Sequence, residues 1–281
     1  MKFKPAYRNS YNLALPLIAS ASITCPLAAN EVNLADKINL ISQANINPSG
    51  ISVSEQETNF SIPSWAKDPL PSPYPIPAEW IFGTQARSSQ TKQSSTNYYR
   101  TSQIISPDGK FAAYSRLELQ AEPELPQSQV NSVLFIENLQ TGELEEINTQ
   151  MYFIQLPEAA SSILPGVMKI LIPASWSKNG KYLLVRQLEG IFSSSDVSDV
   201  ALVWDSNTSQ IKPLLPLGVE YTTAVLLGWS SAESERILFR ASILGEEPHT
   251  WAVYLNGQTV LAEDDQPLSI TYGSIHKTNW I

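Results

Sequence analysis

One pattern of apolar runs and polar turns occurs three times in this chain of 281 residues, and the repetition constrains the fold more than any other feature. In each copy an apolar run leads into a turn and a second apolar run, and a second hairpin follows after a polar loop. The three turns are Ser106–Lys110, Ser177–Lys181 and Ser230–Arg236. Each copy therefore predicts four short antiparallel strands, arranged as two hairpins in series.

The turns have the composition that tight hairpins require. In the first, Pro107 sets φ, Asp108 can bond to the local backbone, and Gly109 can adopt a positive φ. Asn179 and Gly180 supply the same chemistry in the second turn, without the proline. The third turn, like the second, begins with a serine that follows a tryptophan, but it is longer. The first two turns therefore match closely, and the third matches less well.

These features resemble the WD40-like β-propeller repeat of the TolB type, in which a Ser-Pro-Asp-Gly-Lys turn precedes an apolar strand. The resemblance covers residues 98–262. It implies an all-β fold made of four-stranded antiparallel blades. Closed propellers have about four to eight blades, and the pattern occurs three times here. We therefore expect an incomplete β-propeller of three four-stranded blades over residues 98–281.

For function, the resemblance implies a non-enzymatic interaction module of the cell envelope that binds a protein partner through its blades. A fold does not specify an activity, however, because propellers carry many unrelated ones. The alternative is a protein that binds a glycan or another small ligand. A cleft lined by aromatic and acidic side chains would favour the glycan, whereas a flat apolar sheet face would favour the protein partner.

Residues 1–29 have the organisation of a secretory signal peptide. Basic residues precede the apolar stretch 13–24, and the small residues Ala28 and Ala29 suit a cleavage site. A buried N-terminal helix is the alternative, but Pro16 makes it a poor one. We therefore expect an exported protein, periplasmic or extracellular, that begins at residue 30.

Cys25 raises the question of a lipid anchor, because bacterial lipoproteins are acylated on a cysteine just behind the apolar stretch. Their motif resembles Leu-Ala-Gly-Cys. Here Ser22 stands in place of the leucine, and Thr24 stands in place of the glycine. We therefore do not expect an anchor at Cys25.

Residues 30–97 are polar and rich in proline, and we interpret them as an arm that precedes the repeats. Proline occurs at every second position from Pro69 to Pro77, which prevents ladder hydrogen bonds and favours an extended polyproline II path. A stiff strap on the protein's own surface is expected, although a ligand for an aromatic groove is an alternative. We expect Trp65 and Trp80 to pack on the core and Tyr74 to be exposed.

Three blades cannot close a ring, so the first and the third would each leave a sheet face uncovered. Residues 58–62, 78–82 and 268–274 are candidates for additional strands. We expect the arm to cover one open face. A second copy of the chain or an envelope protein would cover the other.

Composition excludes several classes of function. The chain has 27 acidic residues and 18 Lys or Arg, for a formal net charge of −9, which does not suit binding to nucleic acid. Its one cysteine and two histidines cannot form a disulfide framework or a Cys/His zinc site. No apolar run reaches the roughly 18 residues needed to span a bilayer. We find no calcium loop and no phosphate loop, and we predict no metal and no cofactor.

Two patterns suggest catalysis but have simpler explanations. Gly228–Ala232 is similar to the Gly-x-Ser-x-Gly nucleophile elbow, and His249 and His276 follow it. That elbow needs a helix after its serine, whereas an apolar strand follows here. Trp229 and Ser230 also occupy the repeat position of Trp176-Ser177. We therefore predict that the protein is not an enzyme and has no catalytic residues.

The remaining candidates are acid pairs and tryptophans. The pairs Glu145-Glu146, Glu246-Glu247 and Asp264-Asp265 fall at predicted turns and strand ends, where solvated charge is expected. Four tryptophans are expected in the core: Trp176, Trp204, Trp229 and Trp251. Trp280 is expected to be exposed.

Overall fold

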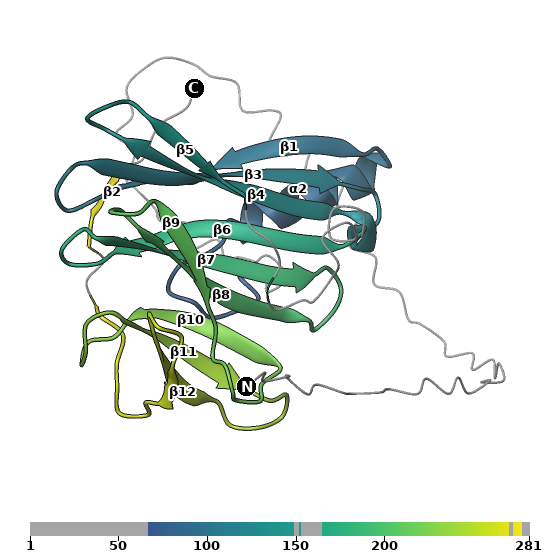
Figure 1. Cartoon of the computed structure of the whole chain (residues 1–281). Coiled ribbons are helices and arrows are strands. Elements are labelled where there is room, and N and C mark those ends of the chain that lie inside the picture. Colours follow the sequence, from purple (N-terminus) through teal and green to yellow (C-terminus); the bar gives the residue numbers. More distant parts are fainter. Residues whose placement is uncertain (1–66, 149–151, 153–164, 270–271, 277–281) are drawn as a thin grey trace, which may run out of the picture. The chain divides into compact units, whose positions relative to one another are not determined.

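Strands of the repeated region make up most of the described structure (Figure 1). The computed structural model describes residues 67–148, 152, 165–269 and 272–276. The expected signal peptide, the candidate strand at 58–62, Trp65 and Trp280 lie outside the described residues. The described residues are mostly β-strand with a single α-helix among them, so the expected all-β class is confirmed.

Twelve of the fourteen described strands form three consecutive antiparallel meanders of four strands each. The first meander consists of β2 (Gln103–Ile105), β3 (Phe111–Ala121), β4 (Gln129–Asn138) and β5 (Leu144–Ile147). The second consists of β6 (Val167–Trp176), β7 (Tyr182–Ile191), β8 (Val197–Asp205) and β9 (Gln210–Leu214). The third consists of β10 (Thr223–Trp229), β11 (Arg236–Ser242), β12 (His249–Tyr254) and β13 (Thr259–Leu261). The 3₁₀-helix η2 (Leu125–Gln127) lies between β3 and β4.

Two more strands extend the first meander. β1 (Ser95–Arg100) pairs with β3 beside β2, so the sheet begins slightly before residue 98. β14 (Ser274–His276) pairs with β2, which places this strand later than the expected range 268–274. A parallel pair between Val130 and Met168 joins the first two meanders into one ten-stranded sheet. The third meander is a separate four-stranded sheet, and neither sheet closes on itself within the described residues.

Apolar side chains fill the space between successive meanders, which lie one above another in Figure 1. Leu183 and Val185 of β7 pack in the cluster shared with the first meander. Leu184, between them, packs in the cluster shared with the third meander. All three side chains are fully buried. Because successive side chains of a strand point to opposite faces, burial on both faces explains why the central strands are continuously apolar.

The expected tryptophan core is found. Trp176 and Trp204 are buried between the first and second meanders, with ring centroids 6.1 Å apart. Phe111 completes this aromatic group at 5.2 Å from the Trp204 ring. Trp229 is buried between the second and third meanders, and Trp251 is half-buried against the same cluster.

The strand expected at 78–82 is wrong, because these residues begin helix α2 (Ala78–Thr91). The buried residues of α2 have helical spacing, but most of them are polar. The sequence therefore lacks the apolar residues at every third or fourth position that indicate a helix. Past the first residue, the buried positions are Ile81, Thr84, Gln85 and Ser88. The Gln85 side chain donates to the carbonyl of Glu122 at 3.4 Å.

The first two turns have equivalent hydrogen bonds, as their sequences predict. The Ser106 hydroxyl donates to the Asp108 carboxylate at 2.7 Å, and the Ser177 hydroxyl contacts the Asn179 side-chain oxygen at the same distance. Gly109 and Gly180 have φ values of 70° and 71°. In the third turn the positive φ belongs to Glu235, at 62°.

These positive φ values lead to a first prediction. Replacing Gly109 or Gly180 with alanine should each lower the free energy of unfolding by about 1–2 kcal/mol, because a Cβ atom is strained in this region. A Cβ at Gly109 would meet no atom within 4 Å, so backbone strain alone is tested there. The measurement is urea unfolding followed by circular dichroism.

Gly83 provides the control, because it lies in helix α2 with nothing within 4 Å of an added Cβ. Alanine there should raise stability by roughly 0.5–1 kcal/mol. Different effects at Gly109 and Gly180 would contradict the equivalence of the two turns, and a loss of the same size at Gly83 would contradict the explanation by positive φ.

Candidate functional site

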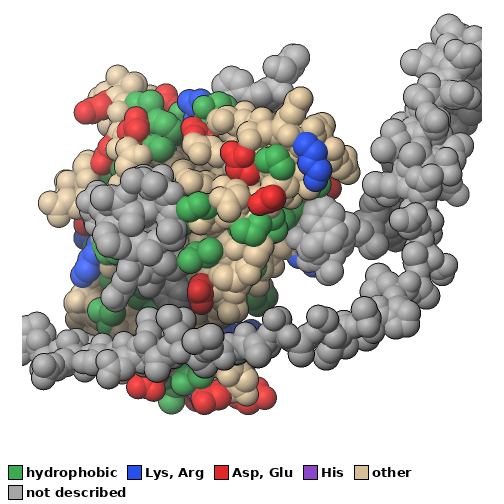
Figure 2. All heavy atoms as spheres, turned by 90° about the vertical axis from the view of Figure 1, so that its right-hand side faces the viewer, with side chains coloured by type: hydrophobic (Ala, Val, Ile, Leu, Met, Phe, Trp, Pro, Cys, Tyr) green, Lys and Arg blue, Asp and Glu red, His purple; other side chains and the backbone are tan. Residues whose placement is uncertain are grey.

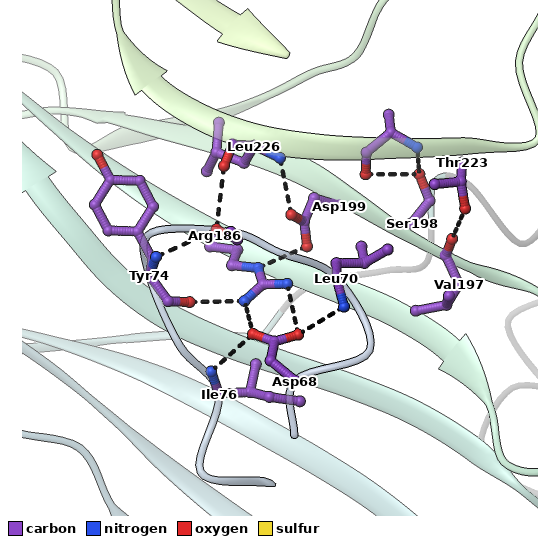
Figure 3. Close-up of polar contacts among 12 residues, drawn as sticks. Asp68, Leu70, Tyr74, Ile76, Arg186, Val197, Ser198, Asp199, Thr223 and Leu226 are labelled. Atoms are coloured by element: carbon purple, nitrogen blue, oxygen red, sulfur yellow. Dashed lines mark hydrogen bonds and ion pairs between the residues drawn. The ribbon is translucent and has the colours of Figure 1, made fainter. Parts of the chain in front are cut away.

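A buried arginine holds the proline-rich arm against the second and third meanders. Arg186 of β7 is fully buried, and its Nε donates to the carboxylate of Asp199 on β8 at 2.6 Å. Its two terminal nitrogens donate to both carboxylate oxygens of Asp68. Nη1 also donates to the backbone carbonyl of Tyr74 at 2.7 Å. Figure 3 shows the arm curving around this group, which we call the Arg186 cluster (Asp68, Arg186 and Asp199).

Asp68 also closes the arm into a loop. Its carboxylate accepts the backbone N–H of Leu70 at 3.0 Å and that of Ile76 at 3.2 Å. Leu70 and Ile76 are themselves buried in one apolar cluster. On the sheet side, Asp199 accepts the backbone N–H of Leu226 on β10 at 2.8 Å. The cluster therefore connects the arm with strands of two meanders (Figure 3).

Tyr74 is not exposed as expected. It is half-buried, and its ring packs in the cluster between the second and third meanders. Burial raises the pKa of its hydroxyl above the ordinary value. A Cβ at Gly228, where φ is 123°, would lie 2.4 Å from the Tyr74 hydroxyl, so glycine there leaves room for the ring. The prediction failed because the space for Tyr74 is made by a residue more than a hundred positions away.

Asp199 leads to a prediction about pH. Complete burial raises its pKa to about 6, although Arg186 and the Leu226 N–H favour the ionised form. Because the folded pKa exceeds 3.8, the ordinary pKa of an aspartate, the carboxyl contributes most to stability below pH 3.8, and this contribution is lost as pH rises through about 6.

Replacing Asp199 with asparagine removes this titration. The free energy of unfolding of the wild type, minus that of Asp199→Asn, should therefore fall by as much as about 3 kcal/mol between pH 4 and pH 7. Urea unfolding of both proteins across this range measures the difference. A difference that stays constant with pH would contradict the prediction.

A cleft of about 730 Å³ opens beside the arm, where the first strands of the three meanders approach one another. Ile104 of β2, Ala174 of β6 and Leu227 of β10 line it. Arm residues 73–77 form one wall, and residues 266–269 contribute to another. We call this space the arm-walled cleft. None of the eighteen described residues that line it has a charged side chain.

A second candidate surface is the face of the first meander that points away from the second meander. We call it the outer face, and it includes Tyr98, Arg100, Tyr114, Arg116 and Phe135, with Glu118 directly opposite Tyr98. The Arg100 guanidinium lies 3.7 Å from the Tyr114 ring centroid, and that of Arg116 lies 4.5 Å from the Tyr98 ring centroid. Tyr114 stacks on Phe135 with centroids 5.2 Å apart. Tyr98 is 55% exposed.

Two of the residues considered for catalysis, Ser230 and His249, have structural partners. The Ser230 hydroxyl is buried, donates to Asp265 at 2.6 Å and accepts the backbone N–H of Glu233 at 3.1 Å. Arg236 binds the same carboxylate. His249 pairs instead with Glu263 at 2.6 Å. Asp265 is therefore a buried turn residue, and the expectation of solvated charge is wrong at this position.

Figure 2 shows acidic side chains and small groups of hydrophobic ones interspersed over the described part of one side of the molecule. In the part of the chain that the structure describes, no three His, Cys, Asp or Glu side chains are grouped in a way that could hold a metal ion. The same part contains no helix with the length and apolar character needed to cross a bilayer.

The sequence interpretation missed the Arg186 cluster. Its local signal is a charged residue directly beside an apolar run in each of two strands, Arg186 after residues 183–185 and Asp199 before residues 200–203. Opposite charges inside neighbouring buried strands indicate an ion pair, because an unpaired buried charge is costly. No local signal points to Asp68, which is 118 residues away from Arg186.

No protein-family model matches the sequence, and no curated protein matches it. Among solved structures, one described as a "putative conserved lipoprotein" from Clostridium novyi NT aligns with a TM-score of 0.32 and 12% identity. The alignment covers 60% of this chain and 96% of that one. We infer neither fold nor function from a likeness at this level. The structure itself defines a mostly β protein of three antiparallel meanders, held together with an N-terminal arm.

Proposed function

We propose that this protein is a non-enzymatic interaction module of the cell envelope that binds a protein partner. We also propose that its meanders are the blades of an incomplete, TolB-like β-propeller. Two observations support the blades: each meander has four consecutive antiparallel strands, and the meanders pack face to face. The equivalent turns at Gly109 and Gly180 support a common repeat.

Export rests on the sequence of residues 1–29. Cleavage after Ala29 would remove Cys25, the single cysteine of the chain, and leave a protein without thiols. Such a protein suits an oxidising compartment. Mass spectrometry of the native protein tests this proposal: an N-terminus at Asn30 supports it, and an intact Met1 contradicts it.

The observation that carries the binding proposal is the composition of the outer face. Tyrosine, phenylalanine and arginine are the residue types enriched at protein interfaces, and here they lie together on an exposed sheet. Each arginine is already placed over an aromatic ring. These side chains are therefore already ordered, so a partner that buries them loses little binding free energy to restricting their conformations.

The charges on this face indicate the chemistry of the partner. Arg100 and Arg116 are directly opposite each other in the β1–β3 register. Arginine forms strong, often bidentate hydrogen bonds with carboxylates, and two neighbouring guanidinium groups offer donors for such a contact. The partner we propose is therefore a protein that presents an Asp or Glu side chain beside apolar residues.

Site-specific photo-crosslinking in the producing cells tests this proposal. A crosslinking amino acid at Tyr98 should yield one discrete adduct. The control position is Leu244, which is 81% exposed in the third meander. Adding the substitution Arg116→Glu should abolish the adduct at Tyr98. The same adducts at both positions, or an adduct that survives Arg116→Glu, would contradict the proposal.

The alternative is a glycan-binding protein, for which the structure offers one specific observation. A hollow of about 590 Å³ near the second and third turns is lined in part by Trp229, Tyr272 and Glu235. Trp229 is only 5% exposed, however, so it presents little ring surface for stacking on a sugar. We therefore place this alternative second. Binding to a glycan array that is lost on Tyr272→Ala would favour it.

A further inference from the structure

We propose that the arm-walled cleft binds an uncharged, largely apolar small molecule. The cleft lies where the first strands of all three meanders meet the arm, and its volume of about 730 Å³ is in the range of small-molecule sites. This proposal does not depend on the partner proposed for the outer face. Tyr99 lines the cleft, whereas Tyr98, its neighbour along β1, belongs to the outer face.

The described residues that line the cleft favour an uncharged ligand. Charged residues make up 16% of the chain, yet none occurs among the eighteen described residues that line the cleft. Five of the eighteen are prolines, at positions 73, 75, 77, 173 and 267. Without a counter-charge, a charged ligand would lose its hydration and gain no compensating ion pair. A neutral ligand has no such cost and buries apolar surface against the lining.

The cleft is preformed, because packing in the cores and hydrogen bonds to the arm fix the residues of its walls. Ile104 and Ala174 are 3% and 4% exposed and belong to the packed cores between the meanders. On the arm side, the Tyr74 carbonyl accepts from Arg186, and the Ile76 N–H donates to Asp68. Little rearrangement is then needed on binding, so less of the binding free energy is lost to ordering.

Besides two tyrosines, the described residues of the lining have four polar side chains, none of which is charged. Ser102, Gln266 and Ser269 are exposed at the rim, and Thr101 is half-buried. The Thr101 hydroxyl already accepts the backbone N–H of Ser115 at 2.8 Å. Hydroxyl and amide groups at the rim suit a ligand that has one neutral polar group, such as an alcohol or an amide, at the end of an apolar body.

Fluorescence titration of the full chain tests the proposal with two related dyes. N-phenyl-1-naphthylamine is neutral, and 8-anilinonaphthalene-1-sulfonate has the same ring system with a sulfonate. We expect saturable binding of the neutral dye at one site per chain. The sulfonate should bind at least about tenfold more weakly, because the described residues of the lining offer it no cation.

Two matched variants locate the site. Ile275 is 61% exposed and lines the cleft, whereas Leu261 is 56% exposed on β13 and does not line it. Ile275→Asp should weaken binding of the neutral dye by at least about tenfold, and Leu261→Asp should leave it unchanged. A third variant, Ser102→Trp, fills the cleft from its exposed rim without adding a charge and should also weaken binding.

Circular dichroism and urea unfolding confirm that each variant remains folded. The proposal is overturned if the neutral dye shows no saturable binding, or if the sulfonate binds as tightly as the neutral dye. It is also overturned if both Ile275→Asp and Ser102→Trp bind like the wild type while folded. Tyr98→Ser, on the outer face, should not change dye binding, so failure of the partner proposal and failure of this one are distinguishable.

Discussion

Replacing Arg186 with leucine should lower the free energy of unfolding by about 3–5 kcal/mol, which is a large part of the roughly 5–15 kcal/mol that stabilises a typical domain. The substitution leaves two carboxylates, those of Asp68 and Asp199, close together without the cation between them. Asp199 is fully buried and has no access to solvent that could compensate. The loss of the Arg186 hydrogen bond to the Tyr74 carbonyl should also loosen the arm.

Urea unfolding at neutral pH measures the effect. The matched control is Arg240→Leu, because Arg240 lies on β11 with an exposed side chain. Surface substitutions of this kind usually change stability by less than about 0.5 kcal/mol. If Arg186→Leu and Arg240→Leu had equal effects, the Arg186 cluster would not hold the arm as we describe.

A multiple variant separates the cost of unpaired charge from the loss of packing. Adding Asp68→Asn and Asp199→Asn to Arg186→Leu removes all three charges. This triple variant should recover part of the lost stability, because removing one partner of a buried ion pair costs more than removing the whole group. Recovery would show that desolvated charge causes the loss. No recovery would assign the loss to packing and hydrogen bonds alone.

Removal of the arm and helix α2 should have an effect of similar or larger size. A chain that begins at Tyr98 lacks three large side chains that are almost fully buried, namely Leu70, Ile76 and Ile81. Burying each of these contributes about 1.5–3 kcal/mol, so their joint loss approaches the whole stability of a domain. The deletion also leaves Arg186 without Asp68. We therefore expect this chain to aggregate or to unfold at much lower urea concentration.

The comparison is a chain that begins at Lys67 and so keeps every residue of the arm and helix that the structure describes. Light scattering reports the mass of both chains, and urea unfolding reports their stability. The Lys67 chain should keep the Arg186 cluster and be much more stable than the Tyr98 chain. If the Tyr98 chain were an equally stable monomer, the arm would be an appendage and our account of it would be wrong.

The meanders could be predicted from sequence because the signals that place them are local. A hairpin turn needs a residue that tolerates positive φ. Gly109 and Gly180 are such residues, and each can be recognised within a segment of five residues. The continuous apolar runs that flank these turns indicate strands that are buried on both faces. Even the third turn, where Glu235 replaces the glycine, could be located from the apolar strands around it.

Helix α2 was missed for a physical reason. Three of the buried positions on its face are Thr84, Gln85 and Ser88, whose polar groups find partners inside the protein. Ser88, for example, hydrogen-bonds to Ser95 at 2.9 Å. Hydrophobic periodicity detects a helix only when the buried face is apolar. A helix buried through polar contacts leaves no such trace.

By itself, the sequence determined the all-β class, the three meanders and their turns, because these depend on neighbours within a few residues. The tertiary structure alone decided where the arm lies, that Tyr74 is half-buried, and that a cleft without charge forms beside it. These features depend on contacts between distant positions, such as Arg186 with Asp68 and Tyr74 with Gly228. A glycine that makes room for a distant ring looks like any other glycine until the chain is folded.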